Sequence, residues 1–307
     1  LATDQEVLGS NPSRRTIMNK IFKQISIYHI LALGLISRIF AMIFYADNFL
    51  ENEWAILIHN YETTGIIGLN VILNDYLAIP KLANAGEEVI PSAYMPPLYI
   101  FFILIIKSLL GGFFNLVTVI ILIQILLGIL SIYIFYKITC RFENIKKYSI
   151  LFSLVFALFP MNVYASVQIS SITLQIFLII GFLYFLPIQK KQISNLIYFS
   201  FFSGLLILIR GEFFIFYILS LMYCFVIIKK DFKLFLLSVI FSLLIVSPYL
   251  LRNYIHFNTI TLTKSFGYNL LKGNNPSLIV EGNPSFVDKN YERKYLKIRA
   301  DNLYEIK

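Results

Sequence analysis

The sequence has few charged side chains and few residues that commonly bind metals. Asp, Glu, Lys and Arg make up 14% of its 307 residues, and there are 2 cysteines and 3 histidines. Cys140 lies beside a basic cluster and Cys224 inside an apolar run, so we expect neither a disulfide nor a cysteine metal site. The histidines show no HxH or HExxH spacing, and no glycine-rich phosphate loop occurs. The sequence therefore supports neither a bound metal nor another cofactor.

Apolar residues dominate what remains. The chain is 58% hydrophobic and 16% aromatic, with a mean hydropathy of +0.75. A soluble domain is usually about 45–50% apolar, so the composition predicts a polytopic membrane protein. The net charge of +9 comes from short basic clusters between apolar runs, a pattern that reports membrane topology rather than nucleic-acid binding. We expect membrane lipids as partners and no nucleic acid.

The two ends differ from the apolar middle. Residues 1–17 are polar and precede Met18, so we interpret them as a non-native or disordered leader. No cleavable signal peptide is evident, because the first apolar run carries Arg38 and leads into an acidic stretch. We predict a membrane module over residues 18–250. Residues 251–307 then begin an extracytoplasmic loop that is truncated.

Eight apolar runs are candidates for crossing the membrane. A spanning helix needs about 20 apolar residues. The runs cover residues 24–45, 96–110, 115–136, 148–164, 171–187, 195–209, 211–228 and 233–250. The run 96–110 is short, with about 15 residues, and it either crosses the membrane or does not. The chain has eight crossings in the first case and seven in the second, and the two cases put different loops in the cytoplasm.

Basic clusters decide between the two topologies. They are Arg14, Arg15, Lys20 and Lys23; Lys137, Arg141, Lys146 and Lys147; Lys190 and Lys191; and Lys229, Lys230 and Lys233. If the run 96–110 crossed, the last three clusters would lie outside, against the positive-inside rule. We therefore predict seven spans, a cytoplasmic N-terminus, and a large first outer loop over residues 46–114 into which the run 96–110 dips.

The first outer loop begins with an acidic cluster. Asp47, Glu51 and Glu53 follow the first apolar run, and the segment LENEWAILIHNYE has the pattern of an amphipathic helix with Trp54 and Tyr61 as interfacial anchors. These carboxylates are either the solvated face of that helix or include a general base that deprotonates an acceptor.

Later in this loop, Tyr94 opens the motif YMPPLY, whose two prolines fix the start of the dipping helix. Interfacial anchoring by its aromatic residues is the simpler interpretation. The motif also places this helix directly beneath the acidic cluster.

Four ionisable residues lie within or at the ends of spans: Arg38, Arg210, Glu212 and Arg252. Such residues are costly in a bilayer and commonly pair with one another or mark a ligand path. Arg210 and Glu212 either pair across their turn or contact substrate. Arg252 either reaches to the interface or, together with Arg38, binds a lipid phosphate, which guanidinium groups bind in a bidentate manner.

In this order, the acidic cluster, EWAILIHN, YMPPLY and the run RNYIHFNTITLTKSFGYNLLKGNNP resemble the GT-C glycosyltransferases. The resemblance covers residues 25–276 and is closest to the bacterial branch of protein O-mannosyltransferases and lipid A aminoarabinose transferases. It implies an all-α polytopic fold, a seven-helix module whose large first extracytoplasmic loop contains interfacial helices. It also implies inverting transfer of a sugar from a polyprenyl-phosphate carrier.

The resemblance also assigns residues. The family's catalytic carboxylate corresponds to Glu51, with Glu53 and Asp47 as alternatives and Leu50 in the family's aspartate position. Trp54 occupies the usual aromatic position.

Other family positions have changed. Met95 replaces the His or Lys that often meets the carrier phosphate, so Arg252 and Lys272 are the expected substitutes. Gln168 stands near the family's second acidic residue, a role that Glu212 could take.

The leading hypothesis is an inverting glycosyltransferase of the bacterial inner membrane that uses a polyprenyl-phosphate-linked sugar and an unidentified acceptor. Two alternatives remain at this stage. One is a non-enzymatic flippase for lipid carriers, which would need broken or charged helices around a midplane cavity. The other is a polymerase or ligase of surface polysaccharide, which would rely on outer-loop Arg and His residues.

Overall fold

A computed structural model describes residues 26–47, 52–69, 89–93, 95–112, 114–187, 195–228 and 232–263. The expected leader, residues 1–17, and the chain after residue 263 lie outside the described residues. The chain divides into two compact units: the first comprises residues 1–46 and 121–168, and the second comprises residues 47–120 and 169–307. Each unit is described by itself.

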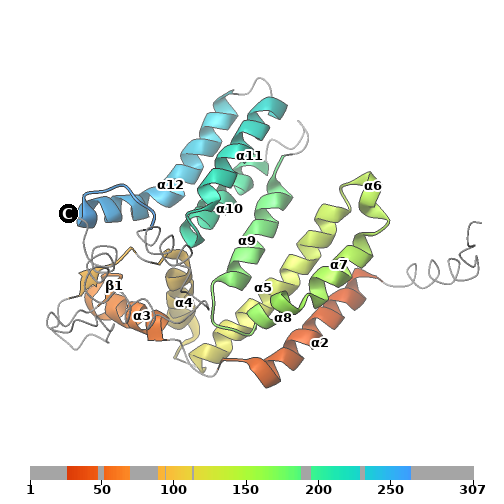
Figure 1. The fold of residues 1–307 in the computed structure, drawn as a ribbon, viewed down its shortest axis with the longest axis horizontal. Helices are drawn as coiled ribbons and strands as arrows, with labels where there is room; N and C mark the ends of the chain where they lie inside the picture. The colour runs from red at the N-terminus through yellow and green to blue at the C-terminus, as the bar shows by residue number, and fades with distance from the viewer. Residues whose placement is uncertain are drawn as a thin grey trace, which may run out of the picture. The chain divides into compact units, whose positions relative to one another are not determined.

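The described residues are almost entirely helical (Figure 1). Wholly or mainly in the first unit are α2 (Ile27–Tyr45), α5 (Leu116–Thr139), α6 (Glu143–Lys146), α7 (Ser149–Leu158) and α8 (Pro160–Ala165). The helices of the second unit are α3 (Asn52–Thr64), α4 (Leu98–Leu110), α9 (Ile172–Phe185), α10 (Asn195–Ile209), α11 (Phe213–Ile228) and α12 (Phe232–Phe257). Two short strands, β1 (Gly68–Leu69) and β2 (Ile90–Pro91), also belong to it.

Among the described residues, three helices are long and apolar enough to cross a membrane: Ile27–Tyr45, Leu116–Thr139 and Phe235–Phe257. Five further apolar helices are shorter, namely Leu98–Leu110, Ser149–Leu158, Ile172–Phe185, Asn195–Ile209 and Phe213–Val226. This pattern fits a polytopic, mainly helical membrane protein. Helix α4, with 13 residues, extends about 20 Å at 1.5 Å per residue, less than the roughly 30 Å of a hydrocarbon core.

The run 148–164, expected as one continuous span, is broken into α7 and α8. Pro160 has no N–H to donate, and Phe159 before it takes an extended conformation (φ −57°, ψ 117°), as residues before proline prefer. The break frees the carbonyl of Phe156, which accepts a 3.4 Å hydrogen bond from the side chain of Asn162. The sequence contained the signal for this break in Pro160.

Arg38 lies at the centre of the first unit. Its side chain is 1% exposed, and its Nη1 donates to the carbonyls of Gly34 (3.0 Å) and Ala157 (3.1 Å). Its Nε is buried and has no hydrogen-bond partner among the residues that the structure describes. The Ala157 carbonyl is in the last turn of α7, just before the break. Arg38 therefore joins α2 to the broken end of α7.

The glycine at position 128 makes room for this guanidinium. A Cβ atom placed on Gly128 would lie 2.8 Å from Nε of Arg38, closer than van der Waals contact. We expect Gly128→Ala to destabilise the protein by about 1–3 kcal/mol, the usual range for overpacking a core.

Thermal unfolding in detergent would measure this loss, with Gly112→Ala as the control because a Cβ atom there meets nothing within 4 Å. Equal melting temperatures for Gly128→Ala and the wild type would contradict the close approach.

In the second unit, α10 packs against both α9 and α12. A seam of hydroxyl groups joins α10 to α12: Ser200 and Ser238 share a short hydrogen bond, and Ser242 donates to the Ser200 carbonyl at 3.1 Å. One turn further along α10, a Cβ atom on Gly204 would lie 2.9 Å from Ile245. Small residues thus let the two helices approach closely, as is common between membrane helices.

Helices α3 and α4 of the predicted first outer loop pack against each other. The rings of Trp54 and Tyr99 meet edge to face with centroids 4.9 Å apart, and Nζ of Lys107 lies 2.6 Å from a carboxylate oxygen of Glu62. Both segments are helical, as expected, and their place outside the membrane stays a prediction. Their helical form and mutual packing make this part of the loop a defined wall rather than a flexible connection.

A two-residue antiparallel ladder, absent from the all-α prediction, follows α3. Gly68 pairs with Pro91 and Leu69 with Ile90. The buried side chain of Asn60 in α3 donates to the Gly68 carbonyl at 2.9 Å, so α3 and β1 are held together.

Candidate functional site

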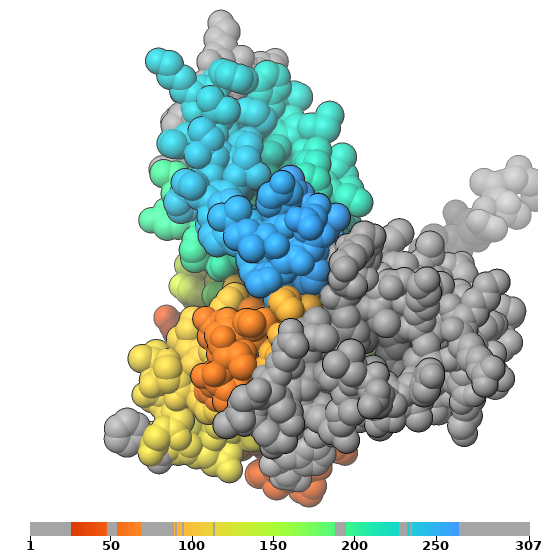
Figure 2. Space-filling view, turned by 90° about the vertical axis from the view of Figure 1, so that its left-hand side faces the viewer, coloured from red at the N-terminus to blue at the C-terminus, as the bar shows by residue number. Residues whose placement is uncertain are grey.

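The second unit contains a pocket of about 240 Å³. The C-terminal part of α12, which forms one side of it, lies next to α3 in the space-filling view (Figure 2, blue and orange). Its lining comes from α3 and the turn after it, α4, α10 and α12: Tyr61, Gly65, Ile66, Ile67, Pro97, Phe101, Leu208, Ile245, Pro248, Tyr249, Arg252 and His256. We call it the α12 pocket.

One face of α12 supplies five of these side chains. Ile245, Pro248, Tyr249, Arg252 and His256 are spaced by three, one, three and four residues, which places them along one side of a helix. The apolar members come first and the cationic members last. The pocket therefore has an apolar end and a polar end.

Pro248 lies inside α12. A proline there cannot donate to the carbonyl four residues earlier, on Leu244. The hydroxyl of Ser247 donates to that carbonyl instead, at 3.3 Å. The helix thus continues past the proline and carries Tyr249 and Arg252 into the pocket.

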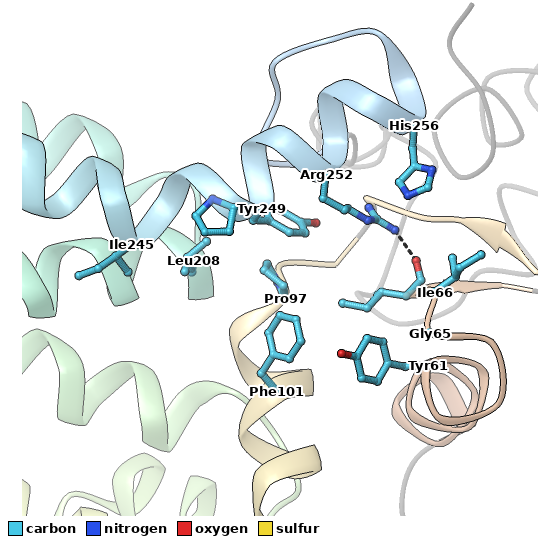
Figure 3. A pocket seen from close by; sticks show the side chains of 12 residues that line it. Tyr61, Gly65, Ile66, Pro97, Phe101, Leu208, Ile245, Tyr249, Arg252 and His256 are labelled. Carbon is cyan, nitrogen blue, oxygen red and sulfur yellow. Dashed lines mark hydrogen bonds between the residues drawn. The ribbon is translucent and has the colours of Figure 1, made fainter.

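Arg252 connects α12 to the strands. Its Nη2 donates to the Ile67 carbonyl at 2.6 Å (dashed line in Figure 3). Its Nη1 donates to the carbonyl of Ser92 at 2.9 Å and to Oδ1 of Asn253 at 2.8 Å. Ile67 also accepts the backbone N–H of Ser92, so Arg252 closes the end of the ladder.

All of these acceptors are neutral, so the charge of Arg252 is not cancelled. Its guanidinium carbon lies 5.8 Å from the ring centre of Tyr249 and 5.6 Å from that of Phe257, which adds cation–π attraction. Among the described residues, no carboxylate forms an ion pair with it. The polar end of the pocket therefore has a net positive charge.

The opposite walls are mainly apolar. Figure 3 shows Pro97 and Phe101 of α4 facing Tyr61 of α3, with the hydroxyl of Tyr61 directed toward the space between them. The rings of Tyr61 and Phe101 meet edge to face at 5.9 Å. Such a site suits a ligand with an anionic group and an apolar portion.

The structure assigns packing roles to two of the predicted site residues. A carboxylate oxygen of Asp47 accepts the backbone N–H of Ile169 at 2.7 Å and so fixes the chain before α9. Trp54 packs α3 on α4 and is not among the residues of the pocket.

The predicted pair Arg210 and Glu212 forms a long contact, with 3.9 Å between Nη1 and Oε2, and both side chains are well exposed, 46% and 78%. A surface ion pair of this kind contributes little to stability, about 0–1 kcal/mol. These two residues are likewise not among those that line the pocket.

Of the other predicted site residues, Arg252 is in the pocket, whereas Arg38 belongs to the first unit, where it is enclosed by α2, α5 and α7. Glu53 lies in the first turn of α3. The remaining three, Glu51, Tyr94 and Lys272, lie outside the described residues. The catalytic assignment of Glu51 and the phosphate-binding assignment of Lys272 therefore remain predictions.

Gln168, which the resemblance to GT-C enzymes sets near an expected second acidic position, has a structural role. Its side chain donates to the Tyr45 carbonyl at 2.5 Å, and the buried side chain of Gln124 donates to the Gln168 carbonyl at 2.6 Å. These two amides hold the non-helical segment before α9 to the end of α2. They satisfy carbonyl groups that would otherwise be costly in an apolar surrounding.

Comparisons with protein families, curated proteins and solved structures found no match to this chain. In the part of the chain that the structure describes, no group of three or more His, Cys, Asp or Glu side chains is arranged to hold a metal ion. The α12 pocket is therefore the feature from which a function can be inferred.

Tyr61 and His256 line the pocket, although the sequence pattern does not predict either as a binding residue. Tyr61 was interpreted as an interfacial anchor, and His256 was considered only for metal-binding spacing. The relevant signal was the spacing of Arg252 and His256, which are four residues apart and so share a helix face. Pro97 was recognised as a helix start, but its place in a pocket depends on long-range packing.

Proposed function

We propose that the protein is an inverting glycosyltransferase of the bacterial cytoplasmic membrane, with seven spans in a GT-C-like arrangement and a cytoplasmic N-terminus. It moves a sugar from a polyprenyl-phosphate carrier to an acceptor on the extracytoplasmic side. The observation that carries the proposal is the α12 pocket, where the guanidinium of Arg252, which has no carboxylate partner among the described residues, lies at one end of a mainly apolar lining.

The chemistry of the pocket matches the carrier. A phosphate group finds in Arg252 a cation with several donors, the arrangement that proteins commonly use for phosphate. Leu208, Ile245 and Pro248 offer an apolar surface beside it, which suits the first part of a prenyl chain. A soluble phosphosugar would make no use of that apolar end.

In the sequence, the predicted base Glu51 directly precedes α3, and the other end of this helix reaches the pocket. Asn52, the first residue of α3, and Tyr61 in the pocket are nine residues apart, about 14 Å along a helix. Glu51 directly precedes Asn52 in the sequence. The proposal therefore requires the sugar of the bound donor to extend from the pocket toward the start of α3.

The test is sugar transfer in membranes that contain the full-length protein. A panel of labelled polyprenyl-phosphate sugars is supplied, and the release of polyprenyl phosphate is followed. We expect release with at least one donor, dependent on the protein. Movement of intact labelled carrier across the bilayer, with no donor consumed, would instead identify a flippase.

A further inference from the structure

Arg252 and His256 lie one turn apart on α12 and both line the α12 pocket (Figure 3). Arg252 is partly buried, whereas His256 is exposed at the pocket's edge. An imidazole can gain or lose a proton, so the charge of His256 depends on pH. The pocket therefore has one permanent cation and one that depends on pH.

The other titratable groups facing His256 do not compensate these charges. They are Tyr61 on α3 and, on α12 itself, Tyr249 and Arg252; α4 and α10 contribute only apolar side chains to the described lining. Tyrosines are neutral near pH 7. When His256 is protonated, the described pocket has two positive charges and no negative one.

We infer that His256 is a second, pH-dependent cation of the anion site formed by Arg252, and that it favours a phosphate monoester with two negative charges over a phosphodiester with one. This inference depends on the proposed function, because it assigns the two phosphate forms to the two ends of that reaction. His256 acts through charge on the phosphate and requires no metal ion.

The charge of the phosphate changes during the proposed transfer. The bond between the anomeric carbon and the phosphate oxygen breaks, and its electron pair stays on that oxygen. The acceptor oxygen forms the new bond to the anomeric carbon, and the acceptor's proton passes to the carboxylate base. A phosphodiester with one charge thus becomes a phosphomonoester that gains a second. Protonated His256 stabilises this second charge as it develops.

The binding experiment uses a dialkyl phosphate in detergent, because its single charge is constant near neutral pH. Its affinity for the full-length protein is measured over a pH series from about 4.5 to about 8, wide enough to titrate an imidazole. We expect affinity to fall roughly tenfold toward the higher pH, the effect of losing one nearby charge at a partly solvated site.

Two substitutions separate charge from shape. His256→Gln should bind the dialkyl phosphate weakly throughout the pH series, and His256→Lys should bind it tightly throughout. The control is His29→Gln, which also replaces a histidine by glutamine. His29 is at the N3 position of the capping box at the start of α2, where glutamine is commonly found. That variant should retain the pH dependence of the wild type.

A polyprenyl phosphate tests the preference for the monoester. The second pKa of a phosphate monoester is about 6. Its affinity should therefore pass through a maximum between that pKa and the pKa of His256, where the ligand carries two charges and the imidazole is protonated most often together. His256→Gln should reduce the preference for monoester over diester, whereas His256→Lys should preserve it. If inorganic phosphate displaced polyprenyl phosphate as effectively as a second lipid phosphate does, the site would recognise free phosphate rather than the lipid.

The outcomes distinguish this inference from the proposed function. If the ligand binds only when Arg252 is present but His256→Gln keeps the pH dependence, the role of His256 is wrong and the pocket remains the carrier site. If an Arg252→Gln variant that folds normally binds as tightly as the wild type at every pH, and His256→Gln changes nothing, neither cation contacts the phosphate. The pocket would then lose its link to the carrier.

Discussion

Glu51→Gln is expected to lower sugar transfer by about 10²–10⁴-fold, the usual contribution of a general base, while donor binding is retained. Glutamine has nearly the shape of glutamate but cannot accept the acceptor's proton. The measurement is the turnover number with a labelled polyprenyl-phosphate sugar, together with donor affinity. Loss of turnover without loss of affinity is the expected signature of a residue that acts in the transition state.

Two further variants test the alternatives to Glu51. Glu53→Gln should keep turnover close to wild type. Asp47→Asn should do so as well, because the amide oxygen can still accept the N–H of Ile169 that Asp47 accepts now. If Glu53→Gln alone removed activity, the base would be Glu53; if all three variants kept full turnover, the base would not belong to this cluster.

Arg252→Leu is expected to have the second large effect, on both folding and ligand binding. The substitution removes three hydrogen bonds, to the carbonyls of Ile67 and Ser92 and to Asn253. Hydrogen bonds from a charged donor contribute about 1.5–3 kcal/mol each and are not additive. We expect a loss of about 3 kcal/mol in the free energy of unfolding and at least a tenfold loss in affinity for polyprenyl phosphate.

Arg252→Lys separates these two effects. Lysine keeps the charge but cannot reproduce the planar fork that reaches both carbonyls, so stability should fall less than in Arg252→Leu and affinity should fall only in part. Thermal unfolding in detergent and direct binding measure the two quantities. Unchanged stability in Arg252→Leu would contradict the role of this residue in closing the ladder.

The apolar character of the chain and the positions of most helices could be predicted from the sequence. Composition alone indicated a membrane protein, because apolar runs of this length have few other uses. The run 148–164 was predicted as one helix because its apolar content outweighed the proline within it. In the structure Pro160 ends the first helix, as its missing N–H requires.

Contacts between distant residues could not be predicted. Arg38 and Ala157 are 119 positions apart. A hydropathy pattern does not show which carbonyl accepts a hydrogen bond from a buried guanidinium. The same holds for the ladder between β1 and β2, whose two-residue strands are too short to produce an alternating pattern. Arg252 was identified from its position at the end of a span, but its partners were not.

The double use of Arg252 has a thermodynamic consequence. The guanidinium has a fixed number of donors, and the carbonyls of Ile67 and Ser92 already occupy two of its nitrogens. Three of the five N–H groups are donated, to Ile67, Ser92 and Asn253, so an anion in the α12 pocket that took one of these three would compete with its present acceptor. Linkage requires the competition to be reciprocal: whatever affinity the anion loses to the carbonyls, the ladder loses in stability when the anion is bound. Binding of an anion in the pocket would thus change the stability of the pairing between β1 and β2.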